Sequence, residues 1–467
     1  MVFSSIPFLY YFLPAVIAAY FISPKRLKNA TLLVFSLIFY AWGEPRFVVF
    51  MLISIAQGYL LGLLIEKFRE KPKLRRVFTL LSCAISVGLL IWCKYADFFI
   101  KNFNALTGLS LPLLNIALPI GISFYTFQIL SYTVDVARGS VSAQKNPINL
   151  GAYVAMFPQL IAGPIVRYSD IADQLSERTH SLEKTAAGAR RFVIGLAKKV
   201  LIANQLGELI AAFKATGDGS TLYMWLYAVA YAIHIYFDFS GYSDMAIGLG
   251  KIFGFDFPEN FNYPFISKSA TEFWRRWHIT LGSWFRDYVY IPMGGNRVSK
   301  PRWLLNIFTV WFLTGFWHGA DWTFILWGLF FAVLLVAEKT LYLKRLEKSK
   351  VLAHVYTLLF VTLSFVLFDS PSVGAAAKNI GAMFGAGGLP PISAEAVYNL
   401  RSYAAILIIG AVGSTPLLKN ILKKISEKPL GRKLLNICEP IALLALLALC
   451  TGYLVDGSFN PFLYFRF

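Results

Sequence analysis

The sequence predicts an all-α polytopic membrane protein, and three features support this fold class. Of its 467 residues, 57% are hydrophobic and only 15% are charged. The mean hydropathy is +0.59, and this apolar composition differs clearly from that of soluble domains. Apolar runs such as residues 404–412 and 441–454 carry no charge at all, which favours lipid over a soluble core as their surroundings.

The N-terminal segment is expected to stay in the membrane. The first 24 residues contain no Lys or Arg, include Pro7 and Pro14, and lack a small-residue cleavage pattern, which argues against a removable signal peptide. Residues 7–21 are therefore expected to form a first span.

The four cysteines lie in or beside apolar stretches, where a free thiol behaves as a small hydrophobe. Without CxxC or Cys/His metal spacing, no metal site is predicted.

Basic residues are grouped in short clusters between the apolar runs. The formal net charge is +19, but the clusters do not follow one soluble face, so cytoplasmic loops explain them better than a nucleic-acid partner. The clusters are residues 25–28, 67–76, 297–302, 339–350 and 419–433. All are expected in the cytoplasm, which requires an even number of spans between any two of them.

The apolar runs satisfy this requirement at both ends of the chain. Spans are expected near residues 31–43, 47–65, 77–95, 113–134, 351–367, 403–417 and 440–454. With this order both termini face outside. Pro, Gly and charged residues interrupt residues 151–260, which favours broken or re-entrant helices there. In all, roughly ten to twelve spans of ~20 residues are expected.

Residues 237–327 are too polar and aromatic for an ordinary lipid-facing segment. Ionisable residues near membrane depth are costly and usually functional. Ser269 and Glu272 have the spacing of a capping box, so one helix is expected to run from there to Trp284, with Glu272 and Arg276 paired one turn apart. Its basic flank and tryptophans fit an amphipathic helix at the cytoplasmic interface, and a simple surface anchor explains that pattern equally well.

His318 lies at the end of an otherwise uncharged apolar helix, after Trp317. A structural histidine would bond to a neighbouring carbonyl or to Asp321. An imidazole beside a thioester can instead take a proton from an attacking hydroxyl, and its place in the membrane favours this functional interpretation. His234 lies one turn before Asp238 and can pair with it, but a packing role is favoured there.

Six segments resemble the signature of the membrane-bound O-acyltransferase family, and of its alginate O-acetylation branch in particular. Two of them are Phe273-Trp-Arg-Arg-Trp-His278-Ile-Thr-Leu and Phe316-Trp-His318-Gly. The others are residues 158–168, 236–248, 284–297 and the aromatic tail 460–467. They follow in the family's order, so the resemblance covers nearly the whole chain, and residues 1–467 are expected to form a single integral-membrane domain.

The resemblance implies a fold and a site. The fold is a bundle of ten to twelve transmembrane helices, with short re-entrant or interfacial helices around a central cavity. An acyl-CoA enters from the cytoplasm, and the acceptor is reached from the other side or from the membrane. His318 matches the family's catalytic histidine, and His278 matches the second, supporting position.

Basic residues near the predicted cytoplasmic side are candidates for binding the phosphates of CoA. They are Arg275, Arg276, Arg286 and Arg297, followed by Lys300 and Arg302. Ordinary positive-inside bias explains the same residues equally well. Candidate donors to the thioester oxyanion are Tyr288, Asn296 and Trp317.

The predicted reaction is transfer of an acetyl group from cytoplasmic acetyl-CoA across a bacterial inner membrane. The implied acceptor is an exported or cell-wall polysaccharide such as alginate, and the resemblance implies an extracytoplasmic SGNH-type partner. No permanently bound cofactor is expected. The nearest alternative is D-alanyl transfer to teichoic acid from a carrier-protein thioester. A transporter or channel with a buried ion relay is a second class, although the matching halves typical of transporters are not visible.

Overall fold

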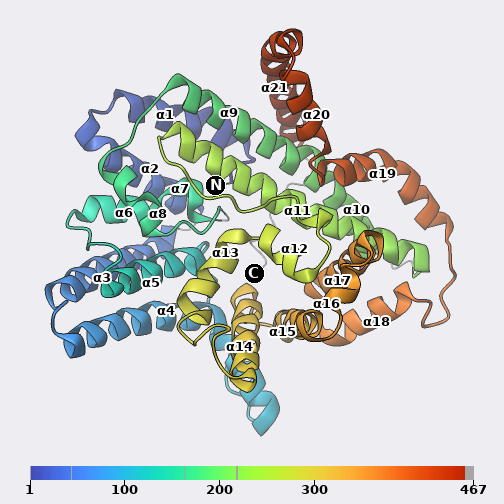
Figure 1. Ribbon diagram of the computed structural model, residues 1–467, viewed down its shortest axis with the longest axis horizontal. Helices are drawn as coiled ribbons and strands as arrows, with labels where there is room; N and C mark the ends of the chain where they lie inside the picture. Colours follow the sequence, from blue (N-terminus) through green and yellow to red (C-terminus); the bar gives the residue numbers. More distant parts are fainter. Residues whose placement is uncertain (1, 44, 162, 217–218, 458–467) are drawn as a thin grey trace. The chain divides into compact units, whose positions relative to one another are not determined.

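The computed structural model describes residues 2–43, 45–161, 163–216 and 219–457, and this part of the chain is built from helices without a β-strand (Figure 1). The chain divides into two compact units, residues 1–192 with 243–258 and residues 193–242 with 259–467. Helices α9 and α11 contribute to both units. The aromatic tail 460–467 lies outside the described residues, and the single membrane domain stays a prediction.

The first unit contains the N-terminal helices. Their bounds are η1 Phe8–Phe12, α1 Leu13–Ile22, η2 Lys25–Leu27, α2 Lys28–Gly43, η3 Pro45–Phe47, α3 Val48–Lys67, α4 Pro72–Thr107, α5 Ile122–Arg138, α6 Pro147–Ala155, α7 Phe157–Leu160, α8 Tyr168–Ser176 and α9 Leu182–Ala197. Helices α3, α4 and α5 pack against one another. A Cβ atom at Gly58 of α3 would lie 2.7 Å from the Ile129 side chain of α5, so a small residue permits this approach.

The second unit contains the C-terminal helices and the predicted site. Their bounds are η4 Lys198–Ala203, α10 Asn204–Thr216, α11 Thr221–Ile252, η5 Pro264–Ile266, α12 Ala270–Arg276, α13 Ile279–Phe285, η6 Arg286–Tyr290, α14 Lys300–His318, α15 Trp322–Ala337, η7 Glu338–Tyr342, α16 Leu343–Leu346, α17 Lys350–Asp369, α18 Val373–Met383, α19 Ala394–Gly413, α20 Leu417–Ser426 and α21 Pro429–Val455. Helices α14 and α15 form a closely packed hairpin, and α14 ends at His318.

Within the described residues, six helical segments are long and apolar enough to cross a membrane. They are Pro45–Lys67, Pro72–Thr107, Trp322–Leu346, Lys350–Asp369, Ala394–Gly413 and Pro429–Val455, and Phe8–Ile22 is a shorter apolar helix. The chain is thus a multi-pass membrane protein. The pair α17/α19 lies between two neighbouring basic clusters and consists of two of these six segments. The pairs α2/α3 and α14/α15 also lie between basic clusters, but α2 and α14 are not among the six, so an even number of spans between all clusters stays a prediction. The sidedness and the total of ten to twelve spans stay predictions.

Two predicted spans are misplaced. The span expected at 113–134 begins only at Ile122, because Gly121 adopts a left-handed conformation with φ of +77° and directly precedes the helix. The span expected at 403–417 is α19, which begins at Ala394. Ser393 caps it by accepting the N–H of Ala396 at 3.0 Å, so the helix starts before Arg401 instead of after it.

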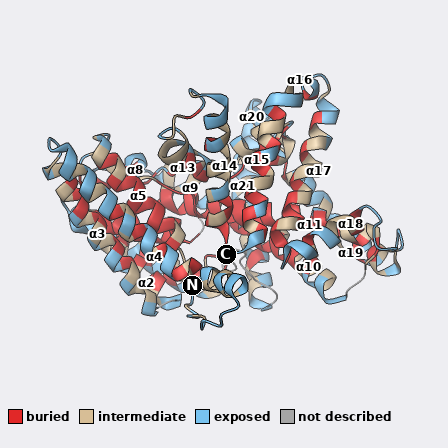
Figure 2. Cartoon of the chain, turned by 90° about the horizontal axis from the view of Figure 1, so that it is seen from below, coloured by how far each residue is buried: buried red, intermediate tan, exposed pale blue. Residues whose placement is uncertain are grey.

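The central stretch was only partly predicted. Residues 147–176 form short, interrupted helices, as expected. By contrast, α9, η4 and α10 follow one another without a break from Leu182 to Thr216, and Thr221–Ile252 is one unbroken helix of 32 residues. Figure 2 shows this helix, α11, buried along most of its length. Its glycines mark close packing instead of breaks, since a Cβ atom at Gly241 would lie 2.7 Å from the carbonyl oxygen of Gly195, and one at Gly248 would lie 2.6 Å from that of Gly188.

Candidate active site

The predicted helix from Ser269 to Trp284 is two short helices, so that prediction is wrong. Its start is confirmed, because the Ser269 Oγ atom accepts the N–H of Glu272 at 3.0 Å. The pair one turn apart is also confirmed, with Arg276 and Glu272 at 2.9 Å. The helix ends before His278, whose φ of +44° and ψ of +51° place it in the left-handed region. Helix α13 then starts at Ile279.

Asn260, which lies 18 residues before His278, stabilises this break. Its carbonyl oxygen accepts the N–H of Ile279 at 3.0 Å, the first residue of α13. Its side-chain oxygen lies 3.0 Å from the His278 Nδ1 atom. Both Asn260 and His278 are only 1% exposed. The site therefore depends on a residue that the sequence analysis did not select.

His278 lies in an aromatic and largely apolar environment. Its ring makes an edge-to-face contact with Phe239, with the ring centroids 4.7 Å apart, and lies 6.1 Å from the Trp317 ring. Burial lowers the pKa of the His278 imidazole well below its usual value, and the positive form of His318 lowers it further. The imidazole is thus neutral at neutral pH.

His318 is the last residue of α14 and is 7% exposed. Its ring centroid lies 5.0 Å from Trp327 of α15 and 5.5 Å from Phe368 of α17, both in edge-to-face contacts. Asp321, the acidic partner considered for a structural histidine, instead caps α15 by accepting the N–H and Oγ1–H groups of Thr323. Three helices therefore position the imidazole through aromatic contacts.

The ring of Trp317 lies close to the rings of both histidines. This residue directly precedes His318 in α14, and the Trp317 and His318 ring centroids lie 5.0 Å apart. Its ring also lies near His278, as given above. The structure thus brings together the two histidines that the sequence analysis selected, from segments 40 residues apart in the chain.

A cavity of about 530 Å³ lies beside His278. It is lined by Thr271, Trp274, Arg275, His278, Ile279, Leu281, Gly282, Ser283, Phe285, Arg286, Val310, Trp311, Thr314 and Leu335. Two of the predicted CoA-binding residues, Arg275 and Arg286, therefore share a cavity with His278. Arg275 is exposed and, among the described residues, no carboxylate pairs with it. Arg286 pairs with Asp287 at 2.7 Å.

The other predicted basic residues lie elsewhere. Arg276 is held by Glu272 and donates to the carbonyl oxygen of Asn262 at 3.1 Å, and it does not line the cavity. Arg297 is exposed in the loop before α14 and does not line the cavity either. Of the four arginines predicted to bind CoA, Arg275 and Arg286 line this cavity, and Arg276 and Arg297 do not.

Buried acidic residues hold the helices around the site. Glu338, which is fully buried, accepts the N–H groups of Ala270 and Thr271 at the start of α12. The pairing of His234 with Asp238, which the sequence allowed but did not favour, does not occur; Asp238 forms an ion pair with Lys199, and both of these side chains are 1% exposed. His234 Nδ1 instead lies 2.7 Å from the carbonyl oxygen of Ala203, in agreement with its favoured packing role.

A second buried acidic group lies next to Phe368. Asp369 accepts from the Tyr227 hydroxyl and pairs with Lys214 at 2.6 Å. The sequence analysis missed this cluster, as it missed Lys199 and Glu338. The sequence feature that could have identified these residues is an isolated charge at the end of an apolar run. Within the described residues, no group of three or more His, Cys, Asp or Glu side chains is arranged to hold a metal ion.

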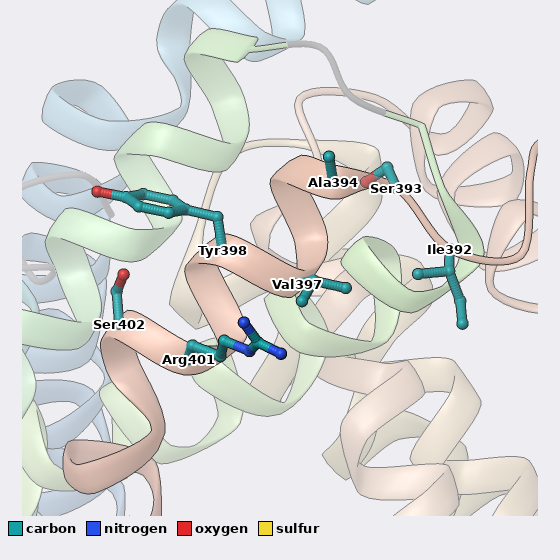
Figure 3. Close-up of a pocket in the computed structure, with 7 residues that line it drawn as sticks. All are labelled: Ile392, Ser393, Ala394, Val397, Tyr398, Arg401 and Ser402. Carbon is teal, nitrogen blue, oxygen red and sulfur yellow. The ribbon is translucent and has the colours of Figure 1, made fainter.

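A larger pocket of about 790 Å³ lies at the start of α19, away from these residues. Figure 3 shows its lining side chains, among them Tyr398, Arg401 and Ser402. None of the histidines or of the predicted CoA-binding arginines lines it. Since volume alone does not supply a base or an anion-binding group, the smaller cavity beside His278 is the better candidate site.

Comparisons with known proteins identify the family of this chain. The model of the membrane-bound O-acyltransferase family matches residues 137–368, which include both histidines. A probable alginate O-acetylase AlgI of Azotobacter vinelandii is 38% identical over 100% of both chains. Another, of Pseudomonas syringae pathovar tomato, is 43% identical over 83% of this chain and 76% of its own. A peptidoglycan O-acetyltransferase of Helicobacter pylori is 34% identical over 83% of this chain and 81% of its own. The chain therefore belongs to the membrane-bound O-acyltransferase family and is an O-acyltransferase.

Proposed function

We propose that this enzyme transfers an acetyl group from cytoplasmic acetyl-CoA to a hydroxyl of an exported or cell-wall polysaccharide at a bacterial inner membrane. The names of the relatives, alginate O-acetylase and peptidoglycan O-acetyltransferase, support an acetyl donor and a polysaccharide acceptor. The observation that carries the proposal is the cavity lined by both Arg275 and His278. The Trp317 ring lies close to the rings of both His278 and His318.

His318 is the general base in this proposal. An acceptor hydroxyl is a poor nucleophile at neutral pH, so a base must accept its proton as the oxygen attacks the thioester carbonyl. The carbon–sulfur bond then breaks, and the imidazolium returns the proton to the departing CoA thiolate. The apolar and aromatic surroundings of His318 favour the neutral imidazole that this step needs.

Arg275 and Arg286 are the first candidates for holding the donor. A cavity of about 530 Å³ lies within the size range of sites for small molecules. Guanidinium groups bind phosphates through paired hydrogen bonds, and Arg275 has no competing carboxylate among the described residues. Arg276 and Arg297 contribute from outside the cavity, through the field at its cytoplasmic side.

The acceptor side involves a second protein in this proposal. An extracytoplasmic SGNH-type acetyltransferase receives the acetyl group, or helps to pass it to the polysaccharide. A reconstituted system can compare product formation with the polysaccharide alone and with the polysaccharide plus such a partner. An increase in product only when the partner is present supports this part of the proposal.

The test is product formation by purified wild-type enzyme and His318→Ala in liposomes with labelled acetyl-CoA. Loss of a general base is expected to lower turnover by ~10²–10⁴-fold. Acetyl-CoA binding, measured by direct titration, should survive, because the arginines hold the phosphates. His278→Ala should keep part of its activity. The control is His180→Ala, which removes an exposed histidine of the first unit and should leave turnover unchanged.

Three results would contradict the proposal. Near-wild-type turnover of His318→Ala would exclude the general base. Consumption of a D-alanyl carrier-protein thioester but not of acetyl-CoA would indicate D-alanyl transfer instead. Movement of a solute without consumption of thioester would indicate a transporter.

A further inference from the structure

Three groups lie within hydrogen-bond distance of the side-chain oxygen of Asn260. The Oδ1 atom accepts the Thr280 hydroxyl at 2.9 Å and the Thr280 N–H at 3.4 Å, and it lies 3.0 Å from His278 Nδ1. The Asn260 side chain lies in the loop between α11 and η5 and is 1% exposed. This convergence holds the imidazole ring against the start of α13.

The arrangement identifies which nitrogen of His278 carries the proton. A backbone N–H group can only donate, so the Asn260 atom that faces Thr280 must be the carbonyl oxygen and not the amide nitrogen. A carbonyl oxygen can only accept, so His278 Nδ1 must donate its hydrogen to it. In a neutral imidazole the other nitrogen, Nε2, then carries the lone pair.

The Nε2 atom is buried, and no described residue forms a hydrogen bond with it. A buried acceptor without a partner costs free energy unless a ligand completes it. The group that completes it must carry a hydrogen, such as a hydroxyl, a thiol or an N–H. Because His278 lines the cavity with Arg275, a substrate is a fitting source of that group.

We propose that Asn260 is a positioning residue that fixes the Nδ1–H tautomer of His278, so that Nε2 serves as a hydrogen-bond acceptor for the reacting groups. This inference rests on the proposed function and deepens it. It implies that His278 orients a hydroxyl or an N–H group, and that it does not donate to the thioester oxyanion from Nε2. The oxyanion must then be stabilised by other donors.

The charges around His278 agree with a neutral ring. Arg275 of α12 and Arg286 of η6 line the same cavity, and His318 lies on α14. When His318 is protonated, its charge disfavours the imidazolium form of His278, and positive guanidinium groups nearby act in the same direction. The nearby carboxylate of α11, Asp238, is paired with Lys199 and does not offset them.

The test compares Asn260→Asp with Asn260→Ala. The aspartate accepts from the same Nδ1–H group, but its negative charge favours the imidazolium, so the pKa of His278 should rise. The acidic limb of the pH profile of kcat should therefore move to higher pH, with activity retained above it. Asn260→Ala should lower kcat by ~10–100-fold, the effect known for loss of the hydrogen-bond partner of a metal-binding histidine. The KM for acetyl-CoA should change little.

The matched control is Asn262→Asp. It adds the same charge two residues away, at an exposed position. Its acidic limb should coincide with that of the wild type. A second readout does not depend on activity: carbethoxylation of His278 by diethyl pyrocarbonate, followed by peptide mass spectrometry at a series of pH values. The half-maximal pH of modification should be higher in Asn260→Asp than in the wild type.

The outcomes separate the two proposals. If the wild type does not transfer acetyl groups, the proposed function fails, and the carbethoxylation profile still tests the role of Asn260. If the wild type is active but Asn260→Asp shows the pH profile and modification profile of the wild type, the tautomer assignment is wrong. Should Asn260→Ala fold poorly, Asn260→Asp alone decides between these results.

Discussion

Gly328 lets helices α14 and α15 pack closely, and this contact leads to a prediction about the position of His318. A Cβ atom at Gly328 of α15 would lie 2.2 Å from the carbonyl oxygen of Trp311 and 3.0 Å from the Cα atom of Gly315, both in α14. These are backbone atoms, which cannot turn away as the end of a flexible side chain can. Gly328→Ala must therefore push the two helices apart.

The size of the displacement follows from these distances. Ordinary contacts of a Cβ atom begin near 3.4 Å, so the helices must separate locally by about 1 Å to accommodate the methyl group. His318 ends α14 and packs on Trp327, the residue directly before Gly328, with ring centroids 5.0 Å apart. A misplacement of ~1 Å can lower the rate of a catalysed reaction by ~10²-fold. We expect kcat to fall by ~10–100-fold, and by more than the KM for acetyl-CoA changes.

The assay is acetyl transfer by purified variants in liposomes, with expression and thermal stability measured in parallel. The matched control is Gly452→Ala in α21, where an added Cβ atom meets no other atom within 4 Å. This variant should have the kcat of the wild type. If Gly328→Ala also retained wild-type kcat, the hairpin would not be what positions His318 for reaction.

Three further predictions concern stability and topology. Lys199→Met removes the ammonium group that pairs with the buried carboxylate of Asp238 and should cost ~3–5 kcal/mol, whereas Lys199→Met with Asp238→Leu should recover much of that loss in denaturation experiments. Ser269→Ala removes the cap of α12 and should lower the free energy of unfolding by ~1 kcal/mol, while Ser269→Asp should preserve it. Cysteines placed in residues 67–76 or 419–433 should resist a membrane-impermeant thiol reagent in intact cells, and rapid labelling there would contradict a cytoplasmic location.

The parts of the structure that the sequence predicts are those that depend on near neighbours in the chain. Apolar runs locate most of the membrane helices, because transfer into lipid depends on the composition of each segment. The Ser269 cap and the Glu272–Arg276 pair follow from spacings of three and four residues on one helix. His318 stands out because an isolated imidazole in an apolar helix is costly without a partner.

The tertiary structure decides what distant residues do to one another. His278 leaves the helical conformation because Asn260, in another loop, accepts hydrogen bonds from both its ring and the following N–H group. Asp238 pairs with Lys199 instead of with His234 one turn away, because η4 packs against α11 at Gly241. In each case a contact between segments distant in the chain outweighs the local pattern, because burial makes an unpaired polar group more costly than a change in local conformation.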